Sequence, residues 1–257
     1  MSTATRGRVV RRVAHVMGMP ISLALRGRHA GDFEGESAWA EAMATLRDVD
    51  RVFSTYRDDS VLSRLDRGEV DLAECPAEVA EVLALGERAR VESGGAFDVR
   101  RGGRLDPSGV VKGWAVERAA RPLRHLPDTD FCLSAGGDMV CRVADAYGPA
   151  WRVGIEDPHD PTRVVAVVPI RDGAVATSGL AHRGGHVVDA RTGVVPRALA
   201  SVTVVHESLV TADIDATAAF ALGVEGPAWL ARRPGRTGIV VHADRRVELV
   251  GDGATAR

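Results

Sequence analysis

Apolar residues in the first part of the chain follow two different patterns, and each predicts one element. Residues 13–25 are apolar enough for a β-strand, which Gly18 and Pro20 interrupt near its middle. Residues 34–56 instead repeat their apolar positions about every 3.6 residues, the period of an amphipathic helix. The apolar positions of this predicted helix are Trp39, Met43, Leu46, Val49 and Phe53.

Three more helices are predicted further along the chain. One covers residues 75–92, with Pro76 well placed in its first turn, and a second covers residues 110–124 after a loop rich in Gly, Asp and Pro. The third, residues 211–223, is rich in alanine and ends at a glycine, which is a common helix stop.

Short β-rich runs separated by Gly, Pro and Asp turns fill most of the remaining sequence. These predicted strands cover residues 131–134, 151–155, 164–170, 174–177, 186–188, 201–205, 238–242 and 246–250. Helices and antiparallel-looking strands are segregated rather than alternating, which favours the α+β class. Because no repeat or linker interrupts the 257 residues, we expect one domain over residues 13–257, after a disordered tail of residues 1–12.

Composition and charge argue against several functional classes. The hydrophobic content of 45% and the charged content of 26% are ordinary for a globular protein, and the formal net charge is −2. No excess positive charge is therefore available to hold nucleic acid or an anionic membrane. No membrane-spanning apolar run and no signal-peptide pattern occurs, so we expect a soluble protein of the cytoplasm. The cysteines (Cys75, Cys132 and Cys141) lack metal-ligand spacing, and their odd number suits a reducing compartment.

A turn that runs into a helix at residues 105–115 is the first candidate site. Such a turn would point free backbone N–H groups at an anion such as a phosphate, although its spacing is not that of a Walker A loop. Lys112 is the only lysine among 33 basic residues, which indicates a need for a compact ammonium group, unless it reflects a GC-rich genome. A lysine in the first helical turn also needs an anion to offset the helix dipole. The alternative is an ordinary helix start capped by Asp106 or Ser108.

A double glycine, Gly136-Gly137, precedes Asp138 between two apolar runs. An ordinary hairpin turn is the simpler interpretation of this pattern. The functional interpretation is a close approach of the backbone to a ligand, which glycine permits.

A histidine and an aspartate, His186 and Asp189, flank a two-residue apolar step in the third candidate segment. A strand there would point them to opposite faces, so they do not form a simple dyad. Asp189 or Thr192 would cap backbone donors in a turn over residues 189–193. A single histidine is more often structural than catalytic, and both interpretations stay open at this point.

Oxygen-bearing side chains one helical turn apart mark the fourth segment. Asp213 and Thr217 would lie on one face of the predicted alanine-rich helix. A carboxylate and a hydroxyl are ligands that a hard cation such as magnesium accepts. The alternative is that Thr211 or Asp213 caps the helix and that Thr217 packs its methyl group.

In their order along the chain, these segments resemble the ApbE family of FAD:protein FMN transferases. The resemblance rests on residues 17–20, 53–65, 94–98, 105–115, 135–138, 151–158, 178–179, 186–193 and 213–223. It implies a single ApbE-like (T-fold-like) domain with antiparallel sheets and segregated helices.

The resemblance also implies roles for particular residues. Magnesium would be held by the side chains of Asp213 and Thr217 and by a backbone carbonyl in the turn at Gly109, with His186 as the base and Asp189 fixing its loop. The residues expected near FAD are Tyr56, Asp106, Ser108, Lys112, Gly136, Gly137, Asp138, Ser178 and Thr192.

The reaction implied by the family is attack of a Thr or Ser hydroxyl of an acceptor flavoprotein on the FMN-side phosphorus of FAD, with release of AMP. A metal ion would neutralise the anionic pyrophosphate, and a base would help a poorly nucleophilic alcohol. Two alternatives use the same site: a metal-dependent FAD pyrophosphatase, in which water attacks, and a flavin-binding protein without catalysis.

Four departures from the family pattern qualify this resemblance. Val61 stands where the family has Glu, and Ala190 replaces the usual Pro. Asp215 puts a carboxylate where the family's helix is apolar, so it is either an extra ligand or a solvated side chain. Only seven residues separate Asp98 from Asp106, and we expect this short stretch to trim the wall of the cofactor pocket.

Overall fold

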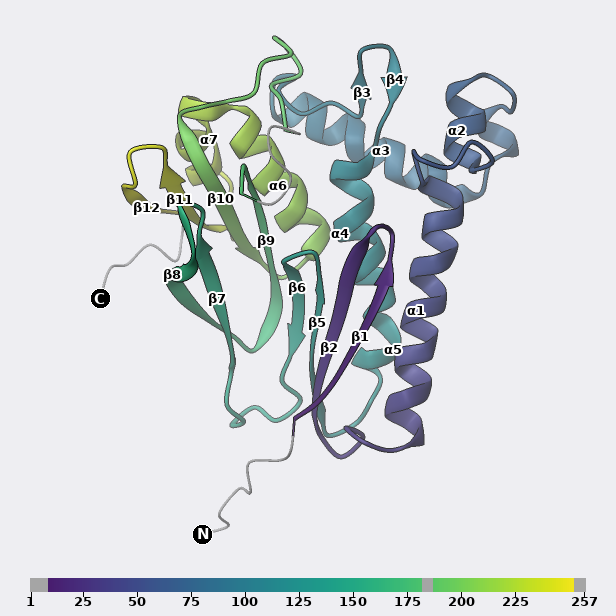
Figure 1. Ribbon diagram of the computed structural model, residues 1–257, viewed down its shortest axis with the longest axis vertical. Helices are drawn as coiled ribbons and strands as arrows, with labels where there is room; N and C mark the ends of the chain where they lie inside the picture. The colour runs from purple at the N-terminus through teal and green to yellow at the C-terminus, as the bar shows by residue number, and fades with distance from the viewer. Residues whose placement is uncertain (1–8, 182–186, 252–257) are drawn as a thin grey trace.

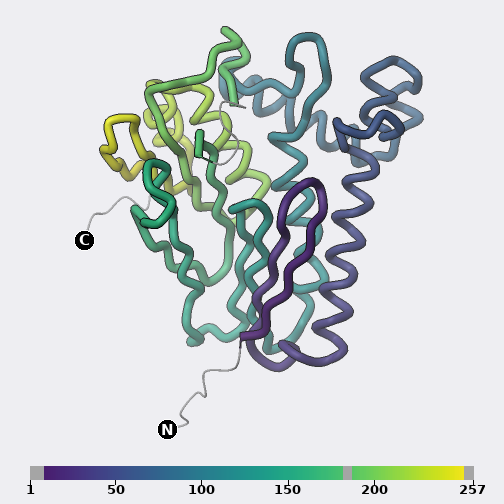
Figure 2. The backbone as a smooth tube through the Cα atoms, viewed as in Figure 1, coloured from purple at the N-terminus to yellow at the C-terminus, as the bar shows by residue number. Residues whose placement is uncertain are grey.

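The computed structural model describes residues 9–181 and 187–251. An eight-stranded sheet, in which all neighbouring strands are antiparallel, forms its centre, with strand order β1-β2-β5-β6-β9-β10-β11-β12 (Figure 1). The strands are β1 (Val10–Val16), β2 (Met19–Gly27), β5 (Thr129–Ala135), β6 (Asp138–Arg142), β9 (Asp172–Gly179), β10 (Leu199–His206), β11 (Thr237–His242) and β12 (Val247–Gly251). Strands distant in sequence thus lie side by side, as the trace in Figure 2 shows for β2 and β5.

Helices cover one face of this sheet (Figure 1). They are α1 (Phe33–Phe53), α2 (Val61–Asp66), α3 (Ala77–Glu92), α4 (Ser108–Ala119), α5 (Arg121–Arg124), α6 (Leu209–Ala221) and α7 (Gly226–Ala231), with short 3-10 turns at Leu72–Glu74 and Gly223–Glu225. The long helix α1 begins where the side chain of Asp32 accepts the backbone N–H of Gly35 at 3.1 Å, a normal N-cap. Its apolar stripe then packs into the main core.

Two smaller ribbons complete the fold. One pairs β3 (Arg100–Arg101) with β4 (Arg104–Leu105), and the other pairs β7 (Trp151–Asp157) with β8 (Asp160–Ile170). Alternation along the sheet strands explains why two layers of core form: Ala174 and Ala176 belong to the helix-side core, whereas Val175 packs with Val153 of β7 in a second cluster. The β7–β8 ribbon therefore covers part of the sheet face opposite the helices.

Most predicted elements are present, and the mixed fold with antiparallel sheets is confirmed. The predicted strand at residues 13–25 is wrong, because the chain turns at Met17 and Gly18 to form the β1–β2 hairpin. Both turn residues have positive φ (55° and 69°), as a two-residue hairpin turn requires. Strand β1 also begins at Val10, inside the segment that we expected to be a disordered tail.

The helix predicted at residues 110–124 begins earlier, at Ser108, and is divided at Ala120 into α4 and α5. Lys112 is therefore in the second turn rather than the first. The alanine-rich helix likewise begins earlier, at Leu209, and its N-cap is Ser208, so neither Thr211 nor Asp213 caps it.

Two strand predictions also need correction. Strand β6 was not predicted, although it continues directly from the Gly136–Gly137 turn. Residues 187 and 188 were predicted as a strand and form none, while His186 lies outside the described residues. None of the helices in the described ranges is long and apolar enough to cross a membrane.

Strands β5 and β6 bring two of the cysteines together. Cys132 and Cys141 are direct cross-strand partners, and their Sγ atoms lie 3.4 Å apart. Sequence spacing did not indicate this pairing, because it depends on the hairpin register rather than on a motif.

Candidate active site

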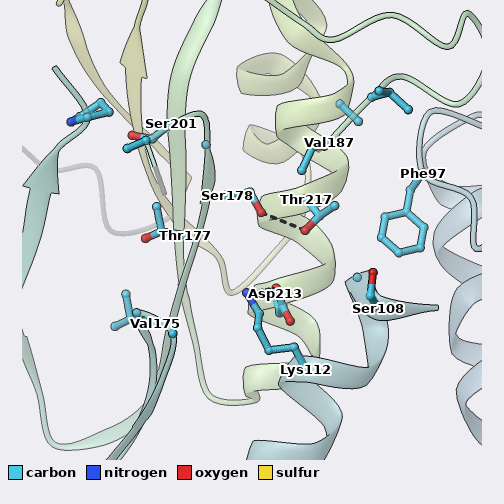
Figure 3. Close-up of a pocket in the computed structure, with 18 of the residues that line it drawn as sticks. Phe97, Ser108, Lys112, Val175, Thr177, Ser178, Val187, Ser201, Asp213 and Thr217 are labelled. Carbon is cyan, nitrogen blue, oxygen red and sulfur yellow. Dashed lines mark hydrogen bonds and ion pairs between the residues drawn. The ribbon is translucent and has the colours of Figure 1, made fainter. Parts of the chain in front are cut away.

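A cavity of about 350 Å³ opens where the beginning of α4 and one face of α6 meet the sheet and β7, a volume typical of small-molecule sites. Figure 3 shows the polar side chains of α4, α6 and β9 gathered at one wall. Nine of the residues predicted from sequence line this cavity: Asp106, Ser108, Gly109, Lys112, Gly136, Gly137, Ser178, Asp213 and Thr217. Segments separated by more than a hundred residues therefore form one site.

The centre of this wall is an ammonium group between two buried carboxylates. The Nζ atom of Lys112 lies 2.6 Å from Asp138 Oδ2 and 3.3 Å from Asp213 Oδ1. Each aspartate is 1% exposed. Backbone N–H groups hold the remaining oxygens, since Gly113 donates to Asp213 Oδ2 at 2.9 Å and Thr177 donates to Asp138 Oδ1 at 3.1 Å. Asp138 thus joins the sheet to α4.

Burial and charge shift the pKa values of this cluster. Burial, together with the nearby charge of Asp138, raises the pKa of Asp213 to about 7, although Lys112 acts in the opposite direction. Burial disfavours the charged form of Lys112, but Asp213 and Asp138 together outweigh it and raise its pKa. One ammonium is therefore shared by two carboxylates. When both are ionised, the cluster carries one excess negative charge, which a bound cation would offset.

A carboxylate, a hydroxyl and a backbone segment meet beside this cluster. Asp213 and Thr217 are one turn apart on α6 and both line the cavity (Figure 3). The Thr217 hydroxyl lies 2.9 Å from that of Ser178 on β9. A Cβ atom added at Gly109 would lie 3.7 Å from the methyl carbon Cγ2 of Thr217, which places the backbone of α4 next to this side chain. These are hard oxygen donors, so the residues present fit a cation such as magnesium.

The double glycine forms the turn between β5 and β6. Gly136 and Gly137 both have positive φ (56° and 100°), so the simpler interpretation as a hairpin turn is confirmed. Both residues also line the cavity, and a Cβ atom at Gly137 would meet nothing within 4 Å. The turn therefore presents open backbone to a ligand.

Four predicted residues within the described ranges do not line the cavity, and one of them, Asp138, lies behind its wall as the partner of Lys112. Tyr56 is 98% exposed after the end of α1. The side chain of Asp189 accepts hydrogen bonds from the side chain of Arg191, and its backbone pairs with Val194. Thr192 is exposed in the same turn. The hydrogen bonds from Arg191 lower the pKa of Asp189.

The neighbours of Asp189 nonetheless reach the cavity. Val187, Val188 and Ala190 line it, and Ala190 N–H donates to the carbonyl of Ala96 at 3.0 Å. The loop-fixing role expected of Asp189 stays a prediction. His186 immediately precedes this stretch but is outside the described residues.

The apolar part of the cavity was missed by residue-level reasoning. Its walls include Phe97, Met139, Val153, Ile155 and Val175. The signal was present for Phe97, Val153 and Ile155, because they lie in segments that carry the family resemblance. Met139 was missed because β6 was not predicted. Val175 was missed because the strand predicted at residues 174–177 did not indicate which of its faces lines a cavity.

Asp215 is neither an extra ligand nor a solvated side chain. It is 1% exposed and forms ion pairs with Arg233 at 3.1 Å and Arg236 at 2.9 Å. It is also absent from the cavity lining. Both expectations for this residue are therefore wrong, because its partners come from a loop some twenty residues later.

The short stretch between Asp98 and Asp106 folds into the β3–β4 hairpin, which turns at Gly102 and Gly103. Asp98, Arg101 and Asp106 still line the cavity. The hairpin therefore contributes to the wall that we expected to be trimmed.

The architecture matches solved structures over nearly the whole chain. The ApbE protein from Thermotoga maritima superimposes with a TM-score of 0.83 at 19% identity, covering 95% of this chain and 97% of that one. The flavin transferase ApbE from Vibrio cholerae gives a TM-score of 0.80 at 22% identity, with 96% and 98% covered. These likenesses define the class by its fold.

Sequence comparison then assigns the family. The model of the ApbE family matches residues 17–103 and 99–241, so the chain belongs to the ApbE family. An FAD:protein FMN transferase from Haemophilus influenzae is 26% identical in a match that covers 73% of each chain. One from Escherichia coli K12 is 33% identical over 141 residues, and this match covers 51% of the present chain and only 40% of the relative.

Proposed function

We propose that the protein transfers FMN from FAD to a Thr or Ser hydroxyl of an acceptor flavoprotein, in a magnesium-dependent reaction that releases AMP. The observation that carries this proposal is the group of oxygen donors formed by Asp213, Thr217 and the Gly109 backbone at one wall of the cavity. Membership of the ApbE family and the names of the relatives support the same reaction.

The metal would be held by Asp213, Thr217 and the carbonyl of Gly109. When bound, magnesium supplies positive charge to the pyrophosphate of FAD and so stabilises the charge that develops on phosphoryl transfer. The two carboxylates around Lys112 favour such an ion, because a single ammonium leaves them incompletely compensated.

Side chains of the chain itself would orient the dinucleotide. Lys112 stays protonated between its two carboxylates and offers a fixed positive charge at the cavity wall. The Gly136–Gly137 turn allows a phosphate or ring to approach the backbone closely. The apolar walls at Phe97, Val153 and Ile155 suit a flat aromatic group and exclude water from it.

In the chemical step, the acceptor's hydroxyl oxygen attacks the FMN-side phosphorus, and the bond from that phosphorus to the bridging oxygen breaks. AMP leaves with the bridging oxygen, and the hydroxyl proton passes to a base. His186 is our candidate for this base, with Asp189 fixing its loop.

Incubation with FAD and magnesium, with and without an FMN-binding acceptor domain, tests this proposal. Acceptor-dependent covalent flavin together with AMP is the expected result. AMP release without acceptor would indicate a pyrophosphatase, and tight FAD binding without AMP would indicate a flavin-binding protein. Asp213→Ala should abolish magnesium-dependent turnover, since it removes the only carboxylate among the proposed ligands.

A further inference from the structure

Helices α4 and α6 carry the three proposed metal ligands, and they contact each other closely. Gly109, Gly113 and Glu117 recur every four residues, so they lie near one face of α4. A Cβ atom at Gly113 would lie 2.9 Å from both Asp213 Cβ and the carbonyl oxygen of Leu209. The backbone of α4 therefore touches α6 at the level of a proposed ligand.

Glu117 binds the start of α6 one turn further along the same face. Its Oε2 atom accepts the hydroxyl of Ser208 at 2.8 Å and the backbone N–H of Val210 at 3.1 Å. The Ser208 hydroxyl in turn accepts the N–H of Thr211 at 3.3 Å, so both functions of this hydroxyl are used. A carboxylate of one helix thus completes the N-cap of another.

The first turn of α6 has no acidic residue of its own. An anion is favourable at a helix N-terminus, and unpaired N–H groups there need acceptors. Glu117 supplies both from α4. Together with the bond from Gly113 N–H to Asp213, this gives α4 two attachment points on α6.

We infer that Glu117 is a positioning residue that fixes α6 along α4, and so sets the distance from the Gly109 carbonyl to Asp213 and Thr217. This inference rests on the proposed function, because it takes those three residues as the ligands. Magnesium requires oxygens at about 2.0–2.1 Å in near-octahedral geometry. A helix rises about 1.5 Å per residue, so even part of a one-residue shift would spoil the site.

The test measures binding of Mn²⁺ to the full-length, metal-free protein by electron paramagnetic resonance, with folding checked by circular dichroism. Glu117→Ala should weaken Mn²⁺ binding about tenfold. Glu117→Gln keeps an acceptor oxygen for Ser208 and Val210, so it should restore binding to within about threefold of wild type. Ser208→Ala loses one of the two bonds to Glu117 and the cap bond from Thr211, so it should also weaken Mn²⁺ binding and serves if Glu117→Ala does not fold.

Glu81→Ala is the matched control. Glu81 lies on α3 and holds another part of α4, where its Oε1 accepts Trp114 Nε1 at 2.8 Å. Its loss should lower stability without changing Mn²⁺ affinity. Wild-type affinity in folded Glu117→Ala, or equal weakening in Glu81→Ala, would overturn the positioning role. If the wild type and Asp213→Ala bind Mn²⁺ equally, the metal assignment itself fails, and the inference for Glu117 fails with it.

Discussion

The hydroxyl of Thr217 on α6 lies 2.9 Å from the hydroxyl of Ser178 on β9, and both groups face the cavity (Figure 3). A hydroxyl has one proton and two lone pairs. When Thr217 donates its proton to Ser178, its lone pairs remain available to a cation. In that direction, the hydrogen bond orients Thr217 in the way that its proposed role as a ligand requires.

Ser178→Ala should weaken binding of Mn²⁺ about three- to tenfold, because Thr217 loses the partner that orients it. The free energy of unfolding should fall by only about 1 kcal/mol, the usual value of one hydrogen bond. Urea unfolding and Mn²⁺ titration measure the two effects separately.

Ser201→Ala provides the control for this variant. Ser201 also lines the cavity, but its buried Oγ has no hydrogen-bond partner within the described part of the chain. Its removal should leave the stability unchanged or slightly higher, with unaltered metal binding. Equal Mn²⁺ affinities in the two serine variants would contradict the orienting role of Ser178.

A second prediction concerns Lys112. Replacing it with methionine leaves Asp138 and Asp213 buried without their shared cation, and breaking such a pair typically costs about 3–5 kcal/mol. Thermal unfolding of Lys112→Met should therefore begin at a much lower temperature than that of the wild type. Added magnesium should recover part of the loss, because it brings positive charge back to these carboxylates.

An arginine at this position should not restore the wild-type stability, since its planar group does not fit a space built for a compact ammonium. Arg57→Met serves as the control, because it removes a cation from an exposed pair with Asp59 and should leave the midpoint almost unchanged. If Lys112→Met unfolds at the wild-type temperature and added magnesium does not change that temperature, this account of the cluster is wrong.

A third prediction tests the close contact between α4 and α6. In Gly113→Ala, the new methyl group would lie 2.9 Å from backbone and side-chain atoms of α6, so one helix must move. Such overpacking typically costs about 1–3 kcal/mol, and here it should also weaken Mn²⁺ binding because it displaces Asp213.

Gly86→Ala is a suitable comparison, because its methyl group would lie 2.5 Å from Cγ1 of Val99, a residue outside α6. We expect a similar loss of stability in urea unfolding and unchanged metal affinity. If both alanine variants reduce Mn²⁺ binding alike, general loosening rather than movement of α6 is responsible.

These contacts also show what the sequence alone predicts and what it does not. The 3.6-residue period of α1 is a local property of the chain, and so is the one-turn spacing of Asp213 and Thr217. Both were predicted correctly. Only the family resemblance predicted that these separate loops form one site, because a local pattern does not indicate which distant segments lie close in space.

Pairings across the chain were not predictable in this way. Glu117 meets Ser208 some ninety residues later, and Cys132 meets Cys141 only because of the register of one hairpin. The β1–β2 turn was missed because Met17, a residue that rarely adopts positive φ, occupies its first position. Such features depend on tertiary packing, which outweighs local preference.

The final prediction concerns the buried ion pairs of Asp215. Asp215→Ala removes the carboxylate that pairs with Arg233 and Arg236, both of which are largely buried. The change takes this carboxylate from Arg236 and leaves Arg233 with the more exposed Glu92, so it should lower the free energy of unfolding by about 3 kcal/mol. Mn²⁺ affinity should stay the same, because Asp215 does not line the cavity.

Glu92→Ala separates this effect from a general loss of acidic groups. Glu92 also pairs with Arg233, at 2.6 Å, but it is nearly half exposed, and Arg233 keeps Asp215 when Glu92 is removed. The loss of stability in urea should therefore be much smaller than in Asp215→Ala. A large drop in Mn²⁺ affinity in folded Asp215→Ala would show instead that this carboxylate belongs to the metal site, as an extra ligand or through the orientation of α6.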